Sequence, residues 1–308
     1  MTFKNSIKLL CANFAEVWKL LVYHIISIGV CVGFLAIFGG QYIDFVNLAS
    51  AESGLADVLE GGTLYGASFA TAVTIIADFV IAFFKIMFTT SIGAGIFFCV
   101  VVFYLLPLLM NVGKIVTCEL VYGYMSSCQK QSFTGTYLKT LRISLSYSSI
   151  KVLYSIPFNF LTLLSIWGLT RINFASLNVL FPFVFVILVA LVLAFKSLLC
   201  SGWAPAKVVY NNSVAKSYRV GMRAVFRNGL SVFSTAFIIY LLAIVVSLVL
   251  GLYAIIIILP IISPLVHIFE MTAFFQSQGM RFYVDGQTIV SPKKLEEVDK
   301  IEDAKYLL

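Results

Sequence analysis

The strongest constraint on the fold of this chain is a set of apolar runs, each long enough to cross the roughly 30 Å hydrocarbon layer of a bilayer. Six of them cover residues 20–38, 95–113, 152–169, 177–200, 230–253 and 254–276. A seventh run, 67–88, carries Asp78 near its middle and Lys85 near its end. Only 11% of the 308 residues are charged, against about a quarter in an ordinary soluble protein. This composition excludes a water-soluble enzyme and predicts a polytopic membrane protein.

The distribution of positive charge predicts the topology. Of the 21 Lys and Arg residues, 19 fall in the segments 1–19, 114–151, 196–228 and 281–308. Cytoplasmic segments of membrane proteins carry the excess of Lys and Arg, so we expect six crossings with both termini in the cytoplasm. A further crossing by 67–88 would move the basic segment 114–151 to the other side. We therefore expect residues 39–94 to form an extracytoplasmic insertion, in which 67–88 is re-entrant or lies against the bundle.

Short recurring motifs indicate an internal repeat. The pattern of Lys139-Thr140-Leu141-Arg142 returns in Lys216-Ser217-Tyr218-Arg219, and a Gln or Asn followed by Ser or Thr occurs at Gln131, Asn212 and Gln287. Each repeat would consist of a cytoplasmic interfacial amphipathic helix, a span outward and a span back. The predicted fold is a single all-α membrane domain, a polytopic bundle of about six transmembrane helices in three hairpins. Its parts are repeat 1 (1–130, with the 39–94 insertion), repeat 2 (131–211), repeat 3 (212–290) and a charged cytoplasmic tail (291–308).

The N-terminal segment and the tail have patterns of their own. Residues 1–19 are expected to form an amphipathic helix on the membrane surface, with its apolar stripe made of Phe3, Ile7, Leu10, Phe14 and Val17. After Ser291 the charges alternate in sign. The tail is expected either to be a solvated helix or to dock through a short helix that Ser291 would cap.

One segment resembles a known group of proteins. Gly202-Trp203-Ala204-Pro205-Ala206-Lys207, followed by Ser213-Val214-Ala215-Lys216-Ser217, resembles the Pro-containing span end, short turn and amphipathic helix of bacterial proteins related to the membrane region of glycerophosphodiester phosphodiesterases. The resemblance covers residues 95–250 and is architectural. It implies a multi-pass protein of the bacterial plasma membrane. No catalytic residue is carried over, and phosphodiesterase activity is not implied.

Ionisable residues inside the expected spans form a candidate site, because each costs about 2.5–3.5 kcal/mol to insert. Alignment of the repeats on Gln131 and Gln287 places Lys114 opposite Glu270 and Asn111 opposite His267, with Lys196 at a similar level in repeat 2. We expect these side chains to converge. They would line a pathway for an ion, a proton or a lipid headgroup. Alternatively, they form a buried ion pair that fixes helix register, or the lysines extend to the interface.

A second candidate site is basic. Arg219, Arg223 and Arg227 follow one another at four-residue intervals, which places them on one face of a helix. Each Lys or Arg beside an anionic leaflet contributes about 1 kcal/mol of attraction, although cytoplasmic bias alone would also explain the pattern. The candidates for contact with anionic headgroups are Lys139, Arg142, Lys216, Arg219, Arg223 and Arg227. The net charge of +7 is thus assigned to membrane lipids and not to nucleic acid.

Motifs for catalysis and metal binding are missing from the sequence. It contains no GxSxG, HExxH or Walker pattern, its two histidines are too few for a zinc site, and its six cysteines form no CxxC pair. We therefore expect no enzymatic activity, no cofactor, no metal and free thiols. The expected function is that of a non-enzymatic integral membrane protein that binds lipid or a membrane protein partner. The alternative is a transporter or flippase-like carrier that uses the polar cluster.

Overall fold

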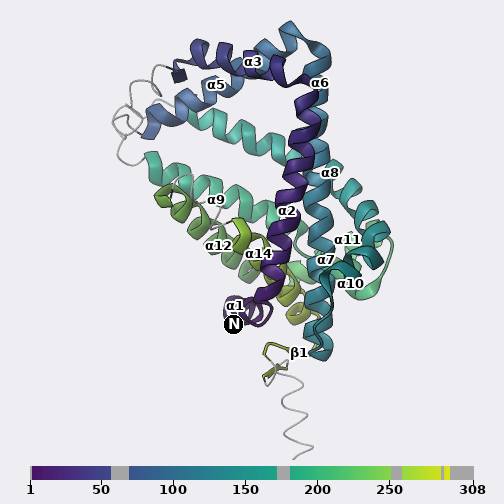
Figure 1. Cartoon of the computed structure of the whole chain (residues 1–308). Helices are drawn as coiled ribbons and strands as arrows, with labels where there is room; N and C mark the ends of the chain where they lie inside the picture. The colour runs from purple at the N-terminus through teal and green to yellow at the C-terminus, as the bar shows by residue number, and fades with distance from the viewer. Residues whose placement is uncertain (1, 57–68, 172–180, 251–258, 286–287, 292–308) are drawn as a thin grey trace, which may run out of the picture. The chain divides into compact units, whose positions relative to one another are not determined.

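The computed structural model describes residues 2–56, 69–171, 181–250, 259–285 and 288–291. Nearly all of these residues are helical, as predicted (Figure 1). A short antiparallel ribbon follows the last helix, where β1 (Phe282–Tyr283) pairs with β2 (Ile289–Val290). The predicted tail helix after Ser291 lies outside the described residues.

The described residues form α-helices along nearly their whole length. The helices are α1 (Thr2–Ala12), α2 (Phe14–Leu35), α3 (Gly39–Ser53), α5 (Phe69–Thr90), α6 (Ile92–Cys99), α7 (Leu106–Ser127), α8 (Phe133–Arg171), α9 (Phe181–Cys200), α10 (Trp203–Tyr210), α11 (Val214–Arg227), α12 (Gly229–Leu250) and α14 (Leu259–Gln278). A 3-10 turn at Ala36–Phe38 separates α2 from α3, and a π-helical stretch at Val100–Leu105 joins α6 to α7. The wider turns of this stretch come just before Pro107, whose ring nitrogen has no hydrogen to donate.

Four helical stretches in the described residues are long and apolar enough to cross a membrane. They are Phe14–Ser53, Ile92–Ser127, Phe183–Tyr210 and Gly229–Ser247. These stretches overlap the first, second, fourth and fifth predicted spans. The other two predicted spans fall in α8 and α14, and residues 254–258 of the last one lie outside the described part. The architecture is thus that of an all-α protein with helices suited to a bilayer.

The helices group into two compact units. The first, here called the terminal unit because both chain ends belong to it, comprises residues 1–24, 110–150 and 193–308. The second, the central unit, comprises residues 25–109 and 151–192. Both candidate sites predicted from the sequence belong to the terminal unit.

The first two helices of the chain meet at Asn13, so the predicted single helix over 1–19 is in fact two. The Asn13 side-chain amide donates to the carbonyl oxygen of Leu9 at 2.9 Å, which satisfies an acceptor at the end of α1. α1 packs against α14, and Ser6 and Leu9 are completely buried. The predicted stripe is therefore interrupted, and its members Ile7 and Phe14 are exposed.

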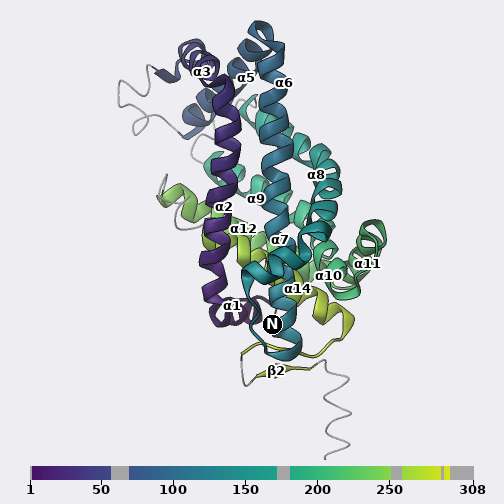
Figure 2. The same cartoon turned by 45° about the vertical axis from the view of Figure 1, so that its right-hand side comes forward.

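The segment that carries the family resemblance forms a tight helical hairpin. α10 and α11 lie side by side (Figure 2), and a Cβ atom on Gly202 or Gly221 would overlap the backbone of the facing glycine. Asn211 turns the chain between the two helices with a φ of 45°. The Trp203 indole then donates to the carbonyl oxygen of Val214 at 2.9 Å. Glycine at both crossing positions lets the two backbones touch, which orients α11.

The N-terminal half of α8 also belongs to the terminal unit. It buries small polar residues four positions apart, namely Thr136, Thr140, Ser144 and Ser148. Small side chains allow close helix approach where lipid supplies no hydrophobic force between helices. α8 continues to Arg171 without a break, although the sequence suggested an interfacial helix followed by a separate span.

The central unit is organised around a pair of helices. α3 and α5 lie side by side (Figures 1 and 2), and Figure 1 shows α3 turning away from the direction of α2. The Tyr42 hydroxyl donates to the carbonyl oxygen of Ala94 at 2.9 Å, and the Lys85 ammonium contacts the Glu52 carboxylate at 2.8 Å. Residues 69–88 of the ambiguous apolar run thus form a helix packed on α3, within the predicted insertion.

Candidate functional site

A buried ion pair between α7 and α14 is the centre of the first candidate site. The Lys114 ammonium contacts the Glu270 carboxylate, and the two side chains are only 6% and 3% exposed. The same helices also meet through the rings of Tyr122 and Phe275, whose centroids are 6.1 Å apart. The meeting of Lys114 with Glu270 that the repeat alignment predicts is therefore observed.

Further polar groups surround this pair. Lys196 of α9 lies within electrostatic range of Lys114, and Tyr147 of α8 and Tyr240 of α12 lie within range of Glu270. Five helices of the terminal unit thus contribute a polar side chain to this region. The two tyrosines were missed at the sequence level, because a tyrosine in an apolar run resembles any other hydrophobic residue there.

The remaining residues of the predicted cluster lie one helical turn away. Asn111 precedes Lys114 on α7 and is half-buried, whereas His267 precedes Glu270 on α14 and is buried. His24 of α2 is also buried, with its ring 6.0 Å from that of Tyr23. Among the described residues, no group of three or more His, Cys, Asp or Glu side chains is placed to hold a metal ion.

Chemically, the arrangement is a pair of opposite charges that satisfy each other. Two charges removed from water keep their ionised forms when they are in direct contact, because their attraction offsets much of the lost hydration. Two cavities are present in the described residues, one between α11 and α12 and a smaller one beside Asn13, and neither is lined by Lys114 or Glu270. The smaller, of about 20 Å³, lies between Asn13, Glu16, Thr117 and Pro264, and has room for about one water molecule.

The second candidate site is the outer face of α11. Lys216, Arg219, Arg223 and Arg227 are all exposed, while the opposite face buries Val214, Ser217, Gly221, Ala224 and Val225. The Ser213 hydroxyl caps the helix by accepting from the amide of Lys216 at 3.4 Å. The packing of the small-residue face on α10 and α14 therefore leaves the four cations directed outward.

Acidic residues that could neutralise these cations are engaged elsewhere. Each acidic residue in the described part of the terminal unit contacts a lysine outside α11, in the pairs Glu16–Lys19, Glu119–Lys139, Glu270–Lys114 and Asp285–Lys8. Between Glu119 and Glu270 the sequence contains eleven Lys or Arg residues and no Asp or Glu. Within the described residues, the basic face of α11 therefore forms no ion pair.

The other predicted lipid contacts lie on α8. Lys139 and Arg142 are both exposed, and Lys139 lies 4.0 Å from Glu119, at the limit of an ion pair. Leu138, beside them, is 67% exposed. A neighbouring pair of cations and an exposed leucine is the pattern of an interfacial helix.

Comparison of the chain with protein-family models, curated proteins and solved structures finds no match.

Proposed function

We propose that this chain is a non-enzymatic integral membrane protein that binds anionic phospholipid headgroups at the cytoplasmic face of the membrane through the basic face of α11. Lys139 and Arg142 of α8 would add a second, weaker contact. The proposed location is the bacterial plasma membrane, which rests on the architectural resemblance described above.

The observation that carries the proposal is the positive charge of α11, which no acidic residue in the described part of the chain neutralises. Four exposed cations share one helix face, and the acidic residues described in the same unit are paired with other lysines. Their combined attraction to an anionic leaflet would amount to about 4 kcal/mol. A soluble anionic partner would meet the same charge. However, α12 begins two residues after α11 and is apolar enough to enter the bilayer, so the basic face lies where headgroups are available.

The proposed topology has six crossings in three hairpins, with both termini in the cytoplasm. Four crossings would be made by the apolar stretches identified above, and α8 and α14 would supply the other two. α3 and α5 carry exposed Glu52 and Lys85 that neutralise each other, which suits a helix pair outside the hydrocarbon layer. This arrangement agrees with the bias of Lys and Arg toward the inner side.

A carrier that uses the polar cluster is the second candidate function. It is favoured by the presence of Lys196, Tyr147 and Tyr240 in the electrostatic neighbourhood of the Lys114–Glu270 pair, since polar groups between helices commonly mark a substrate path. Reconstitution in liposomes would test it through lipid scrambling and solute uptake. A carrier of this kind would lose activity in Glu270→Gln, whereas activity that is absent from the wild type or unchanged in Glu270→Gln would rule it out.

The lipid-binding proposal is tested by measuring which lipids accompany the protein. Wild-type protein is extracted with its surrounding lipid from vesicles of phosphatidylcholine and phosphatidylglycerol, and both lipids are quantified by mass spectrometry. We expect enrichment of phosphatidylglycerol over the bulk composition, and a smaller enrichment in Arg223→Gln. Lys85→Gln removes an exposed cation on the proposed outer side, where it is paired with Glu52, and should leave the enrichment unchanged. Equal lipid ratios around all three proteins would refute the proposal.

A further inference from the structure

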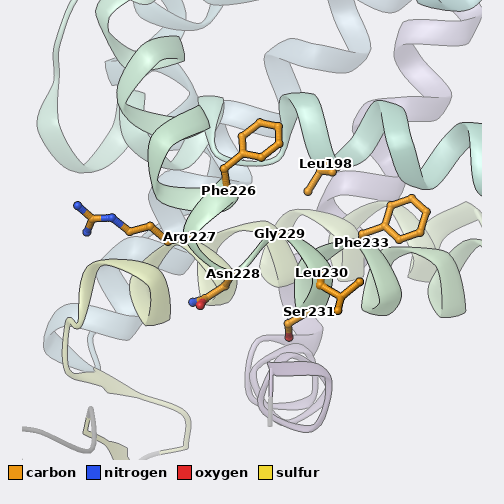
Figure 3. Close-up of a pocket in the computed structure, with 8 residues that line it drawn as sticks. All are labelled: Leu198, Phe226, Arg227, Asn228, Gly229, Leu230, Ser231 and Phe233. Atoms are coloured by element: carbon orange, nitrogen blue, oxygen red, sulfur yellow. The ribbon is translucent and has the colours of Figure 1, made fainter.

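A groove lies at the junction of α11 and α12, apart from the Lys114–Glu270 pair. It has a volume of about 600 Å³, within the range of pockets that hold small ligands. Figure 3 shows its lining, which comes from the end of α11, the start of α12 and one residue of α9: Leu198, Phe226, Arg227, Asn228, Gly229, Leu230, Ser231 and Phe233.

The two ends of this groove differ in chemistry. Leu198, Phe226 and Phe233 supply an apolar wall, whereas Arg227 extends away from these rings and presents its guanidinium at the other side (Figure 3). Asn228 and Ser231 lie between the two ends. An occupant that fits must therefore combine an apolar part with an anionic part.

The exposure of the apolar residues indicates that the occupant is a lipid. Leu230 is 84% exposed and Phe226 is 51% exposed, so both present apolar surface that acyl chains would cover. Both flank the start of α12, a helix suited to cross the membrane, so they lie where acyl chains begin. Gly229, Leu230 and Ser231 of the first turn of α12 also line the groove, and the amide hydrogens of a first helical turn lack partners within their own helix.

We propose that this groove binds one anionic phospholipid molecule, with its phosphate near Arg227 and its acyl chains along Leu198 and Phe233. The inference rests on the proposed function, because it places a discrete site within the general attraction of α11 for an anionic leaflet. General attraction depends on how many cations the helix carries. A discrete site depends on which cation is present and on whether the groove is open.

Native mass spectrometry of the detergent-solubilised protein, purified with added phosphatidylglycerol, separates these two cases. Wild type is expected to retain one phosphatidylglycerol molecule after its loosely bound lipids are lost. Arg227→Gln should lower this retained fraction about fivefold or more. Arg219→Gln is the comparison variant: it removes the same charge from the same helix face two turns from the groove, so it should weaken the general attraction of α11 but lower the retained fraction far less than Arg227→Gln does. Ser231→Trp fills the groove without changing the charge and should also abolish retention.

The possible outcomes are distinct. Equal losses in Arg227→Gln and Arg219→Gln, with retention in Ser231→Trp, would overturn the discrete site and leave the proposed function standing. No preference of the wild type for phosphatidylglycerol over phosphatidylcholine would overturn both. Displacement of the lipid by millimolar glycerol phosphate would show that the groove recognises a soluble phosphoester, which would also overturn the lipid assignment. Arg227→Gln alters an exposed side chain, so its folding is expected to match that of the control.

Discussion

The Lys114–Glu270 pair allows a sharp test of the fold, because the two partners can be removed separately or together. Lys114→Met leaves the Glu270 carboxylate buried without its counter-ion, and Glu270→Met does the same to the Lys114 ammonium. The double variant replaces both charges with apolar side chains of similar size. The three proteins therefore distinguish the cost of an uncompensated charge from the loss of an attractive contact.

The expected magnitudes follow from the burial of the pair. Side chains that are 6% and 3% exposed have almost no access to water, so breaking the pair should lower the free energy of unfolding by about 3–5 kcal/mol in either single variant. This corresponds to a more than hundredfold fall in the ratio of folded to unfolded protein. The double variant should recover most of the loss, because well-packed apolar residues often replace a buried ion pair at little cost.

Unfolding by sodium dodecyl sulfate in mixed micelles, followed by far-ultraviolet circular dichroism, measures these differences. Lys8→Met is the matched control: its partner Asp285 is 3.4 Å away, but the two side chains are 44% and 40% exposed, so the change should stay below about 1 kcal/mol. If both single variants at the buried pair behaved like this control, or if the double variant lost the sum of the two single effects, the reasoning about burial would be wrong.

Two further predictions concern helix packing. Gly221→Ala should destabilise the terminal unit by about 1–3 kcal/mol, because the added methyl group would meet backbone, whereas Gly33→Ala, which meets nothing within 4 Å, should be neutral or stabilising in the same assay. Tyr42→Phe removes the hydroxyl that donates to the Ala94 carbonyl and should cost about 0.5–1.5 kcal/mol. Faster hydrogen exchange confined to α3 and α6 would verify the Tyr42 prediction, and exchange rates unchanged from wild type would contradict it.

Part of the candidate site was predictable because the repeat motifs identify equivalent positions in two different helices. Counting back the same number of residues from Gln131 and Gln287 places Lys114 and Glu270 at one level, and the structure pairs them. The pathway role proposed for the cluster stays a prediction. Tyr147 and Tyr240 could not be assigned in this way, because the sequence pattern does not distinguish a tyrosine that faces a polar group from one that faces lipid.

The positions of helix ends were harder to predict. The stripe over 1–19 has a regular helical period, but the side chain of Asn13 bonds to Leu9 and ends α1, so two short helices with different buried faces result. Conversely, α8 runs through the expected boundary between interfacial helix and span. Local side-chain hydrogen bonds and tertiary packing determine where such helices end, and the average hydrophobic periodicity of a segment does not report either of them.

The distance along the chain between Lys114 and Glu270 has a consequence for biogenesis. The glutamate is synthesised 156 residues after the lysine, which takes roughly 8–30 seconds at typical translation rates of about 5–20 residues per second. During that interval α7 has left the ribosome while its lysine still lacks a counter-ion. A nascent chain that stops before α14 would keep the Lys114 charge without its counter-ion.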